Sequence, residues 1–281
     1  MDEYRRANRA LWDEWVGIHS RSAMYALDQF KAGQSSLHRL ELDELGQVNG
    51  RSLLHLQCHF GLDTLSWARL GAHATGIDFS EQGISLARSL SQELGIPARF
   101  LCCDLYDLPQ HLLEQFDIVF TSYGVLAWLS DLGGWAQVVA HFLKPGGVFY
   151  IAELHPFGML FNEESPELRL RYPYFDTGVI ASPIEGSYAD RQAEVHQKTS
   201  YEWAYPLGEV VSSLIAAGLR IQFLHEFPFC VYGMYSFLEQ AEDGYYYLPE
   251  SARKSSSPTA GNPGAGHPQT IPLMFSIKAE K

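Results

Sequence analysis

The chain opens on a helical pattern of apolar positions. Apolar and aromatic residues recur there at intervals of three and four, which places five of them on one helical face: Leu11, Trp12, Trp15, Val16 and His19. Charged residues such as Arg5 and Glu14 fall elsewhere on the wheel. We therefore expect residues 1–50 to form helices that precede the main domain as an N-terminal lid.

From Ser52 onward, short apolar runs alternate with amphipathic stretches. The apolar runs predict strands at 52–57, 73–79, 98–103, 116–122 and 148–154, and the stretches between them predict helices at 62–71, 80–95 and 135–142. Ser80 is the expected N-cap of the second of these helices. This rhythm is typical of an α/β fold with a doubly wound parallel sheet, which we assign to residues 51–154.

The rhythm stops between residues 155 and 206. This stretch is crowded with aromatic residues, and four side chains alternate on one face of an extended segment: Val195, Thr199, Tyr201 and Trp203. We expect an inserted cap that contains at least one hairpin. A second irregular stretch, residues 254–270, is rich in Ser, Gly and Pro and is expected to form a mobile loop.

The sheet pattern resumes in residues 207–281, which we expect to complete the core. Strands are predicted at 219–227 and 272–279, after a helix over 209–218. That helix would pack through a face that carries Val211, Leu214, Ile215 and Gly218.

Composition and charge narrow the class of protein. The 281 residues are 46% hydrophobic and 19% charged, a composition that is ordinary for a globular protein. The net charge of −13 is unfavourable for binding a phosphate backbone. We therefore expect no nucleic-acid partner.

The N-terminus carries charges where a secretory signal has its apolar core, and no apolar run approaches about twenty residues. We expect a cytoplasmic protein without a membrane segment. The four cysteines have neither CxxC nor zinc spacing and are expected to be reduced.

Candidate chemistry lies directly after the strands, because ligands of a doubly wound sheet bind beyond the carboxyl ends of its strands. The first strand is followed by Gln57–Gly61, which opens a helix whose N-terminal N–H groups favour a carboxylate or a phosphate. Asp78 ends the second strand, Asp104 follows the third, and residues 121–123 end the fourth.

Together with the turn KPGG at 144–147, these motifs resemble those of the class I S-adenosylmethionine-dependent methyltransferases. The similarity is strong over residues 50–155, and the run HLQCHFGLDTLSWARLGA is similar to one branch of mostly uncharacterised bacterial members. The resemblance implies a Rossmann-like, seven-stranded sheet whose last strand, 272–279, runs antiparallel beside the fifth. It also implies S-adenosylmethionine as the cofactor and methyl transfer as the activity.

The resemblance assigns cofactor contacts residue by residue. The loop with Gln57, Cys58, His59 and Gly61 would pass the methionine moiety. Asp78, with Phe79 beside it, would accept from the ribose hydroxyls, Asp104 with Leu105 would hold the adenine, and Thr121 and Ser122 would contact the amino-acid end. The family's usual acidic residue and first two glycines are here His55, Gln57 and His59. The loop could therefore be wider, or His59 could itself meet the cofactor carboxylate.

Each of these residues also has a structural alternative. Asp78 could cap the next helix, Asp104 could be a turn residue, and Tyr123 could be a packed aromatic side chain. His55 is expected to be a hydrogen-bonded histidine of a buried strand.

Glu153 and His155 are candidates for proton transfer. They lie two residues apart at a strand end, so their side chains would project to the same side, where a carboxylate and an imidazole could remove a proton from the methyl acceptor. Tyr123 is a third catalytic candidate. Alternatively, Glu153 could bind a backbone amide of the cap while His155 and Pro156 make the exit turn. A metal site built from Glu153, His155 and His196 is disfavoured, because only the first two have a suitable spacing.

The substrate is expected to be a small organic molecule held by aromatic and polar side chains of the lid and the cap: Trp12, His19, Tyr25, His196 and Trp203. The lid could equally be a contact in a homodimer. Two other functions stay open. A nicotinamide-dependent oxidoreductase is disfavoured because GxGxxG is absent at 57–62, and a non-catalytic binding protein would explain the altered glycine loop.

Overall fold

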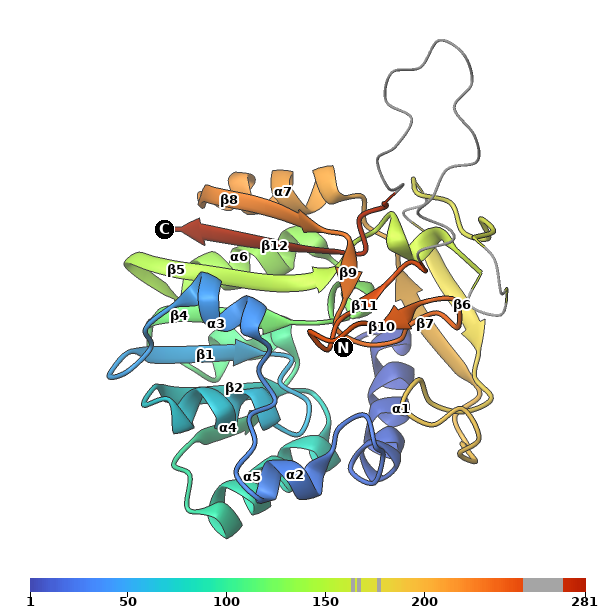
Figure 1. The fold of residues 1–281 in the computed structure, drawn as a ribbon. Helices are drawn as coiled ribbons and strands as arrows, with labels where there is room; N and C mark the ends of the chain where they lie inside the picture. Colours follow the sequence, from blue (N-terminus) through green and yellow to red (C-terminus); the bar gives the residue numbers. More distant parts are fainter. Residues whose placement is uncertain (163–164, 166–167, 176–177, 250–269) are drawn as a thin grey trace.

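The computed structural model describes residues 1–162, 165, 168–175, 178–249 and 270–281. Its centre is a seven-stranded sheet with the strand order β3-β2-β1-β4-β5-β12-β8 (Figure 1). The strands of this sheet are β1 Ser52–Leu56, β2 His73–Asp78, β3 Arg99–Cys102, β4 Phe116–Ser122, β5 Leu143–Leu154, β8 Arg220–Phe227 and β12 Met274–Glu280. The doubly wound α/β prediction is confirmed.

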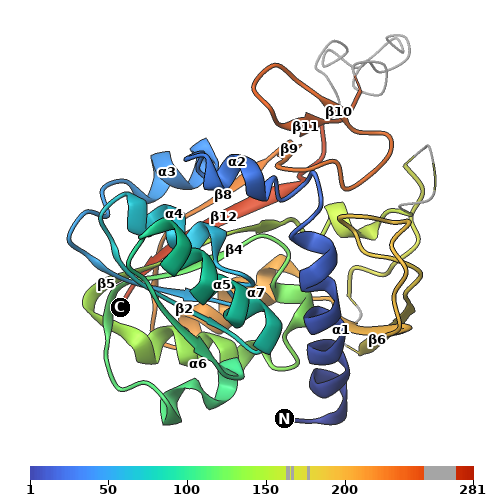
Figure 2. The same cartoon turned by 90° about the horizontal axis from the view of Figure 1, so that it is seen from below.

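Helices cover both faces of this sheet. The α-helices are α1 Glu3–His19, α2 Leu27–Lys31, α3 Arg39–Leu45, α4 Leu62–Arg69, α5 Glu81–Leu94, α6 Leu132–Phe142 and α7 Leu207–Ala216, and three short 3-10 turns are η1 Leu105–Gln110, η2 Leu126–Trp128 and η3 Gly158–Leu160. Figure 2 shows α3 and α6 on opposite sides of the sheet. Trp67 of α4 and Trp135 of α6 are fully buried, so each face is sealed by a large aromatic side chain.

The last strand lies inside the sheet. β12 pairs antiparallel with β5, where Met274 faces Leu154, and antiparallel with β8, where Met274 faces Phe227. The other pairs in the sheet, from β3 through β5, are parallel. The expected position of residues 272–279 beside the fifth strand is therefore confirmed.

Helix α7 packs by a face that overlaps the expected one. Val210 and Leu214 are fully buried, and Val211 is partly buried against the same cluster. Ile215 is 56% exposed and Gly218 is exposed, so the expected face is confirmed at Val211 and Leu214 and is wrong at Ile215 and Gly218. Helix α7 contacts α6.

The two irregular stretches form small additions to the core. In the expected cap, β6 Val179–Pro183 pairs antiparallel with β7 Thr199–Trp203, so the predicted hairpin is present. A three-stranded sheet of β9 Phe229–Cys230, β11 Tyr246–Tyr247 and β10 Glu239–Gln240 follows β8. The expected mobile loop at 254–270 lies, except for its last residue, outside the described residues.

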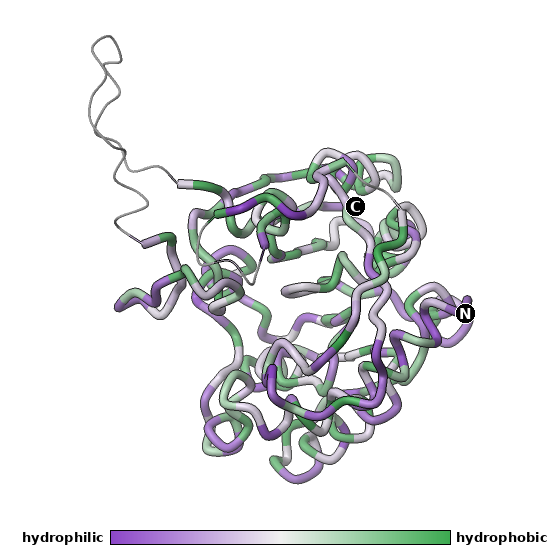
Figure 3. Tube along the Cα trace, turned by 90° about the vertical axis from the view of Figure 1, so that its right-hand side faces the viewer, coloured by the Kyte–Doolittle hydropathy of each residue, from purple (hydrophilic) through white to green (hydrophobic). Residues whose placement is uncertain are grey.

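Helix α1 lies across the end of the sheet to which the arrows of β1 and β5 point, with the β6–β7 hairpin beside it (Figure 1). Asp2 caps the helix by accepting a hydrogen bond from the Arg5 N–H. Leu11 and Trp15 are buried, and in Figure 3 hydrophilic and hydrophobic positions alternate along this helix beside the N-terminus. Hence α1 is amphipathic, and it covers the sheet edge where the sequence places the cofactor residues.

Candidate active site

The loop after β1 has a left-handed backbone at three alternate residues. The φ angles are +55° at Gln57, +51° at His59 and +79° at Gly61. A Cβ on Gly61 would lie 2.6 Å from the ring of Phe100, so only glycine fits there. At Gln57 and His59 a side chain is accommodated, but the left-handed conformation costs about 1–2 kcal/mol for each non-glycine residue. The loop therefore keeps the left-handed backbone that favours glycine, although Gln57 and His59 stand where the family has its first two glycines.

Asp78 ties this loop to the end of β2. Its Oδ2 accepts a hydrogen bond from the His59 N–H at 2.8 Å, and its Oδ1 accepts one from the Ser80 N–H at 2.9 Å. The N-cap of α5 is Ser80 itself, whose Oγ accepts from the Gly83 N–H, as the sequence predicts. Burial raises the pKa of Asp78 to about 6. The carboxylate thus fixes the cofactor loop and leaves further lone pairs for a ligand.

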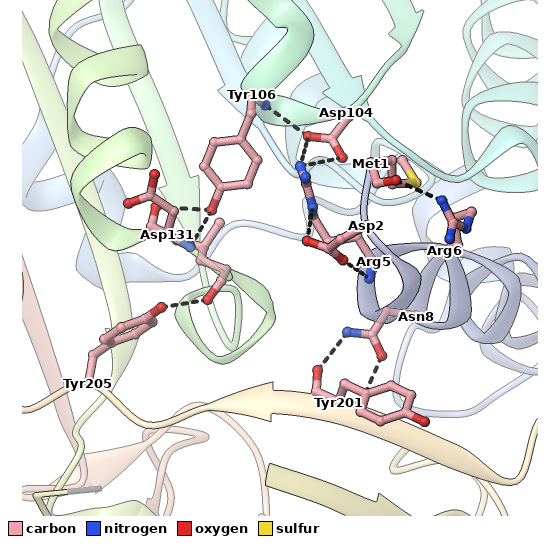
Figure 4. A network of polar contacts seen from close by, with 11 residues as sticks. Met1, Asp2, Arg5, Arg6, Asn8, Asp104, Tyr106, Asp131, Tyr201 and Tyr205 are labelled. Atoms are coloured by element: carbon pink, nitrogen blue, oxygen red, sulfur yellow. Dashed lines mark hydrogen bonds and ion pairs between the residues drawn. The ribbon is translucent and has the colours of Figure 1, made fainter. Parts of the chain in front are cut away.

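Asp104 follows β3 and is held by the lid helix (Figure 4). Nη1 of Arg5 lies 3.0 Å from both carboxylate oxygens, and the Tyr106 N–H donates to Oδ1 at 2.9 Å. The side chain of Asp104 is only 4% exposed. Its structural alternative is also present, because Asp104 caps η1. The cap uses one lone pair of Oδ1, and the carboxylate remains close to the loop and Asp78.

Polar contacts fasten the lid helix along its whole length to the core on one side and to the cap on the other. On the core side, Arg9 pairs with Glu81 at 2.6 Å, and Asp13 accepts from the Ser80 hydroxyl at 2.6 Å. On the cap side, Asn8 exchanges two hydrogen bonds with the backbone of Tyr201 (Figure 4). Helix α1 is therefore bound to the core through Glu81 and Ser80, and to the cap through the backbone of Tyr201.

Several expected cofactor residues direct their side chains into the core. Cys58 and Leu105 are buried in hydrophobic clusters, and the Thr121 hydroxyl donates to the Leu56 carbonyl at 3.4 Å. Phe79 is partly buried, and its carbonyl accepts from the Cys102 thiol. The side chains of Cys58, Leu105 and Thr121 are therefore directed into the core and not toward a ligand. His55 is the hydrogen-bonded histidine expected in the first strand, with Nδ1 2.8 Å from the Thr64 hydroxyl.

The end of β4 meets two acids that the sequence analysis did not select. The Ser122 hydroxyl donates to Asp63 at 3.0 Å, and the Tyr123 hydroxyl donates to Glu41 of α3 at 2.5 Å. Glu41 is fully buried, and burial raises its pKa to about 8. Tyr123 has a φ of +41°, so this loop also carries a strained non-glycine residue.

Glu153 binds the backbone of the loop after β4. Its carboxylate accepts hydrogen bonds from the N–H groups of Gly124 at 2.5 Å, Val125 at 2.7 Å and Leu126 at 3.1 Å, and Leu154 donates a further one at 2.6 Å. Burial raises the pKa of this carboxyl against the opposing effect of these donors. With four donors, the carboxylate has little capacity left for a substrate proton. Glu153 thus binds backbone amides, as the alternative expected, but those of the loop after β4 and of Leu154; the expected partner in the cap was wrong.

The His155 side chain contacts the exit turn after β5 and the neighbouring strand β8. Its Nδ1 accepts from the Phe157 N–H at 3.0 Å, and its Nε2 lies 2.9 Å from Glu226 of β8. The ring therefore shapes the exit turn, and burial lowers its pKa. The described residues contain no group of three or more His, Cys, Asp or Glu side chains that could hold a metal ion.

Four rings from the lid and the cap form a cluster with His59 of the loop after β1. The ring centroids of Trp12 and His59 are 5.1 Å apart, and the ring centroid of His19 is 5.0 Å from those of both His59 and Tyr25. The hydroxyl oxygens of Tyr25 and Tyr188 are 2.5 Å apart. Burial lowers the pKa of His19 to about 3 and that of His59 well below its usual value, so both rings are neutral at neutral pH. Three of the expected substrate residues, Trp12, His19 and Tyr25, thus come together.

The other two expected substrate residues lie elsewhere. His196 is 85% exposed on its side chain and pairs with Glu14 of the lid at 2.9 Å. Trp203 of β7 contacts Tyr4, near the start of α1. Both residues join the cap to the lid and lie outside the ring cluster.

The residues missed by sequence reasoning are Arg5, Glu41, Asp63 and the pair Ser187–Tyr188. A sequence signal existed for Arg5, which follows its capping Asp2 by three residues, but nothing local links it to Asp104, 99 positions away. Glu41 lies three residues after His38, a capping-box spacing, although histidine is an unusual N-cap. Asp63, Ser187 and Tyr188 had no distinguishing local pattern.

The residues present fit the methionine end of S-adenosylmethionine. Among the described residues, Oε1 of Gln57 and Nδ1 of His59 are buried without a hydrogen-bond partner. Leaving such an atom unpaired costs about 1–3 kcal/mol, and a ligand with hydrogen-bond donors would supply the missing partners. Asp78 and Asp104 add two carboxylates that can accept from hydroxyl and amine groups.

Part of the chain is similar to known methyltransferase sequences. Residues 53–147 match the family model described as a methyltransferase domain. The ubiquinone biosynthesis O-methyltransferase of Bordetella avium is 31% identical over 137 residues, which cover 47% of this chain and 56% of that enzyme. The corresponding enzyme of Caulobacter vibrioides is 31% identical over 124 residues, 43% of this chain and 49% of its own length. The chain thus spans about half the length of the curated relatives it matches.

Solved structures share the fold over most of the chain. A structure described as a putative S-adenosylmethionine-dependent methyltransferase from Listeria monocytogenes superposes with a TM-score of 0.55 at 18% identity, covering 86% of this chain and 95% of that one. Another, from Mesorhizobium loti, gives a TM-score of 0.53 at 18% identity over 89% of this chain and all of that one. In the described part of the chain, no helix is long and apolar enough to span a membrane. Residues 53–147 thus match a methyltransferase domain, and the chain shares the fold of these two solved structures.

Proposed function

We propose that this protein transfers the methyl group of S-adenosylmethionine to a small organic acceptor. One observation carries the proposal: the loop after β1, Asp78 after β2 and Asp104 after β3 meet at one edge of the sheet under helix α1, within the matched domain. Asp78 is suited to accept from the ribose hydroxyls and Asp104 from the adenine amine. The loop at Gln57–Gly61 and Ser122 belong to the amino-acid end.

The chain's own residues would bind, orient and exclude water. The cofactor supplies an electrophilic methyl group on a sulfonium. Holding an acceptor in line with that group at near-attack distance can lower a barrier by about 7–11 kcal/mol, so positioning accounts for most of the expected rate. The lid contacts of Arg5, Arg9 and Asp13 keep the site closed to solvent while the reactants are aligned.

The ring cluster suits a positively charged sulfonium. The faces of Trp12 and Tyr25 attract a cation, and the imidazoles of His19 and His59 are uncharged and do not repel it. We assign Trp12, His19, Tyr25 and Tyr188 to the wall between the cofactor and an organic substrate. His196 and Trp203 hold the cap on the lid and act on the substrate only through that contact.

Tyr123 is our candidate for handling the acceptor's proton. Its hydroxyl already donates to Glu41, whose raised pKa allows this pair to take up a proton near neutral pH. Glu153 would act as a positioning residue, because it holds the backbone of residues 124–126 at the end of β4. We assign no proton transfer to His155, which is engaged by Phe157 and Glu226.

The acceptor class follows from the same surroundings. An aromatic wall formed by the lid and cap suits an organic molecule of moderate size, and the net charge of −13 disfavours a nucleic acid. The matched relatives named for ubiquinone biosynthesis methylate oxygen, so an O-methyl product is the first one to seek. We place the protein in the cytoplasm and leave the exposed outer face of the lid as the surface for a homodimer.

The test has a binding part and a transfer part. Isothermal titration with S-adenosylhomocysteine measures cofactor binding, and incubation of a metabolite extract with methyl-labelled S-adenosylmethionine, followed by mass spectrometry, identifies a methylated product. Binding together with a labelled product supports the proposal. Binding without any product points to a non-catalytic ligand-binding protein. Absence of binding, or binding of reduced nicotinamide dinucleotide instead, refutes it.

A further inference from the structure

The loop after β1 holds two buried polar atoms that face no partner among the described residues. They are Oε1 of Gln57 and Nδ1 of His59. Both residues have a left-handed backbone, at φ values of +55° and +51°, which a side chain adopts only at a cost. Strain and unpaired atoms at two positions of one short loop indicate that these side chains have a ligand to bind.

The orientation of the Gln57 amide is fixed. Its Nε2 donates to the Val125 carbonyl at 3.2 Å, so the unpaired atom is the carbonyl oxygen, which can only accept a hydrogen bond. The partner that this oxygen lacks is therefore a donor.

A chain of hydrogen bonds links the proton positions of His59 to those of His19 and Ser187. Its Nε2 lies 2.9 Å from Nδ1 of His19, and Nε2 of His19 lies 2.7 Å from the Ser187 hydroxyl. When each imidazole donates toward Ser187, Nδ1 of His59 becomes an acceptor, as Oε1 of Gln57 already is. A donor-rich ligand selects this order, because the reverse order would place an N–H against it.

We propose that Gln57 and His59 bind the α-ammonium group of the cofactor's methionine moiety with their side chains. The inference rests on the proposed function and deepens it. Two acceptors on one loop match the N–H donors of an ammonium group, while the first turn of α4, which begins directly after Gly61, favours the carboxylate of the same moiety. Burial keeps both histidines uncharged, so no positive charge opposes the ammonium.

The experiment compares two ligands that differ in the amino-acid part. S-adenosylhomocysteine carries it, whereas 5′-methylthioadenosine has the same adenine, ribose and sulfur without it. Dissociation constants are measured by calorimetry for the wild type, Gln57→Gly and His59→Gly. Glycine suits the left-handed backbone at both positions, so these variants keep the loop conformation and lose only the side chain.

We expect each variant to bind S-adenosylhomocysteine about 10- to 100-fold more weakly and to bind methylthioadenosine within about twofold of the wild type. Ala26→Gly is the matched control, since Ala26 is another non-glycine residue at positive φ (+44°) but has no polar side-chain atom. It should leave the preference between the two ligands unchanged.

Two results separate failure of this inference from failure of the proposed function. Equal weakening of both ligands, or no weakening of either, in the glycine variants overturns the side-chain recognition of the ammonium while the methyltransferase proposal stands. No binding of either ligand by the wild type overturns both. Melting curves of all variants show whether a lost affinity reflects a lost fold.

Discussion

Arg5 and Asp104 lie 99 positions apart in the sequence, yet one nitrogen of the arginine is 3.0 Å from both oxygens of the aspartate. This contact joins the first turns of the lid helix to the residue that follows β3. The carboxylate is buried on its side chain while the guanidinium is 19% exposed, so solvent screens the pair only partly.

Removing Arg5 should loosen the lid. In Arg5→Ala the Asp104 carboxylate loses a charged partner, which we expect to cost about 2 kcal/mol of lid docking. Hydrogen exchange across Glu3–His19 should become faster by more than tenfold. The control is Arg39→Ala, whose ion pair with Asp43 is exposed on both sides. Unchanged exchange in the lid of Arg5→Ala would show that its apolar face alone holds it down.

Asp78 should make the protein more stable in mild acid. Its pKa is about 6 in the folded protein, against 3.8 as the ordinary value, so the folded state binds the proton more tightly. The free energy of unfolding should therefore fall as the pH rises from about 4 to about 6, by about 3 kcal/mol from this group. In Asp78→Asn that contribution disappears, and urea titrations of both proteins across this range measure the difference.

If the free energy of unfolding changed with pH equally in the wild type and in Asp78→Asn, the pH dependence could not be assigned to Asp78. The same variant tests cofactor binding, because an amide can accept at one atom only. We expect its affinity for S-adenosylhomocysteine to fall by about tenfold, the effect of one hydrogen bond to a charged group.

Glu153→Gln should destabilise the protein and slow methyl transfer, but it should not change which groups titrate in the reaction. The amide can satisfy fewer of the backbone donors at residues 124–126, so we expect a loss of about 2–4 kcal/mol in the free energy of unfolding and a lower rate of methyl transfer. The pH profile of the remaining rate should keep the wild-type shape. A profile that loses its acidic limb in this variant would instead make Glu153 the general base.

Gly61→Ala should be far more damaging than alanine at another left-handed glycine. At Gly61 the new methyl group would lie 2.6 Å from the ring of Phe100, whereas at Gly146, with a φ of +74°, nothing lies within 4 Å. Both variants incur about 1–2 kcal/mol of backbone strain, and the clash adds about 1–3 kcal/mol at Gly61 alone. Denaturant unfolding of the two variants compares them directly, and equal losses would mean that Phe100 moves aside freely.

The sequence predicts the core of the fold well because that core follows local patterns. β4 spans Phe116–Ser122 as expected, since a continuous apolar run bounded by polar residues is typical of a buried strand. The predicted face of α7 is right at Leu214 and missed Val210, because Val210 and Val211 both continue an apolar stripe. Only packing in the finished fold buries Val210 fully and leaves Val211 partly buried.

The candidate site divides in the same way. Asp78, Asp104 and the loop at Gln57–Gly61 are found at strand ends, where topology alone places ligands. The Tyr123–Glu41 contact joins residues 82 positions apart, and Ser187 reaches His19 across 168. No periodicity or spacing encodes such pairs, because they arise only when the lid and the cap dock on the finished sheet.

The place of β12 has a consequence for biosynthesis. Until Met274–Glu280 has emerged from the ribosome, β5 and β8 cannot be joined, and each presents an unpaired row of N–H and C=O groups. The nascent chain therefore carries an unpaired edge on β5 once Leu154 has been made, and a second one on β8 once Phe227 has been made. A premature stop codon between Phe227 and Met274 would make this intermediate permanent, leaving a product prone to aggregation or proteolysis instead of a truncated but working domain.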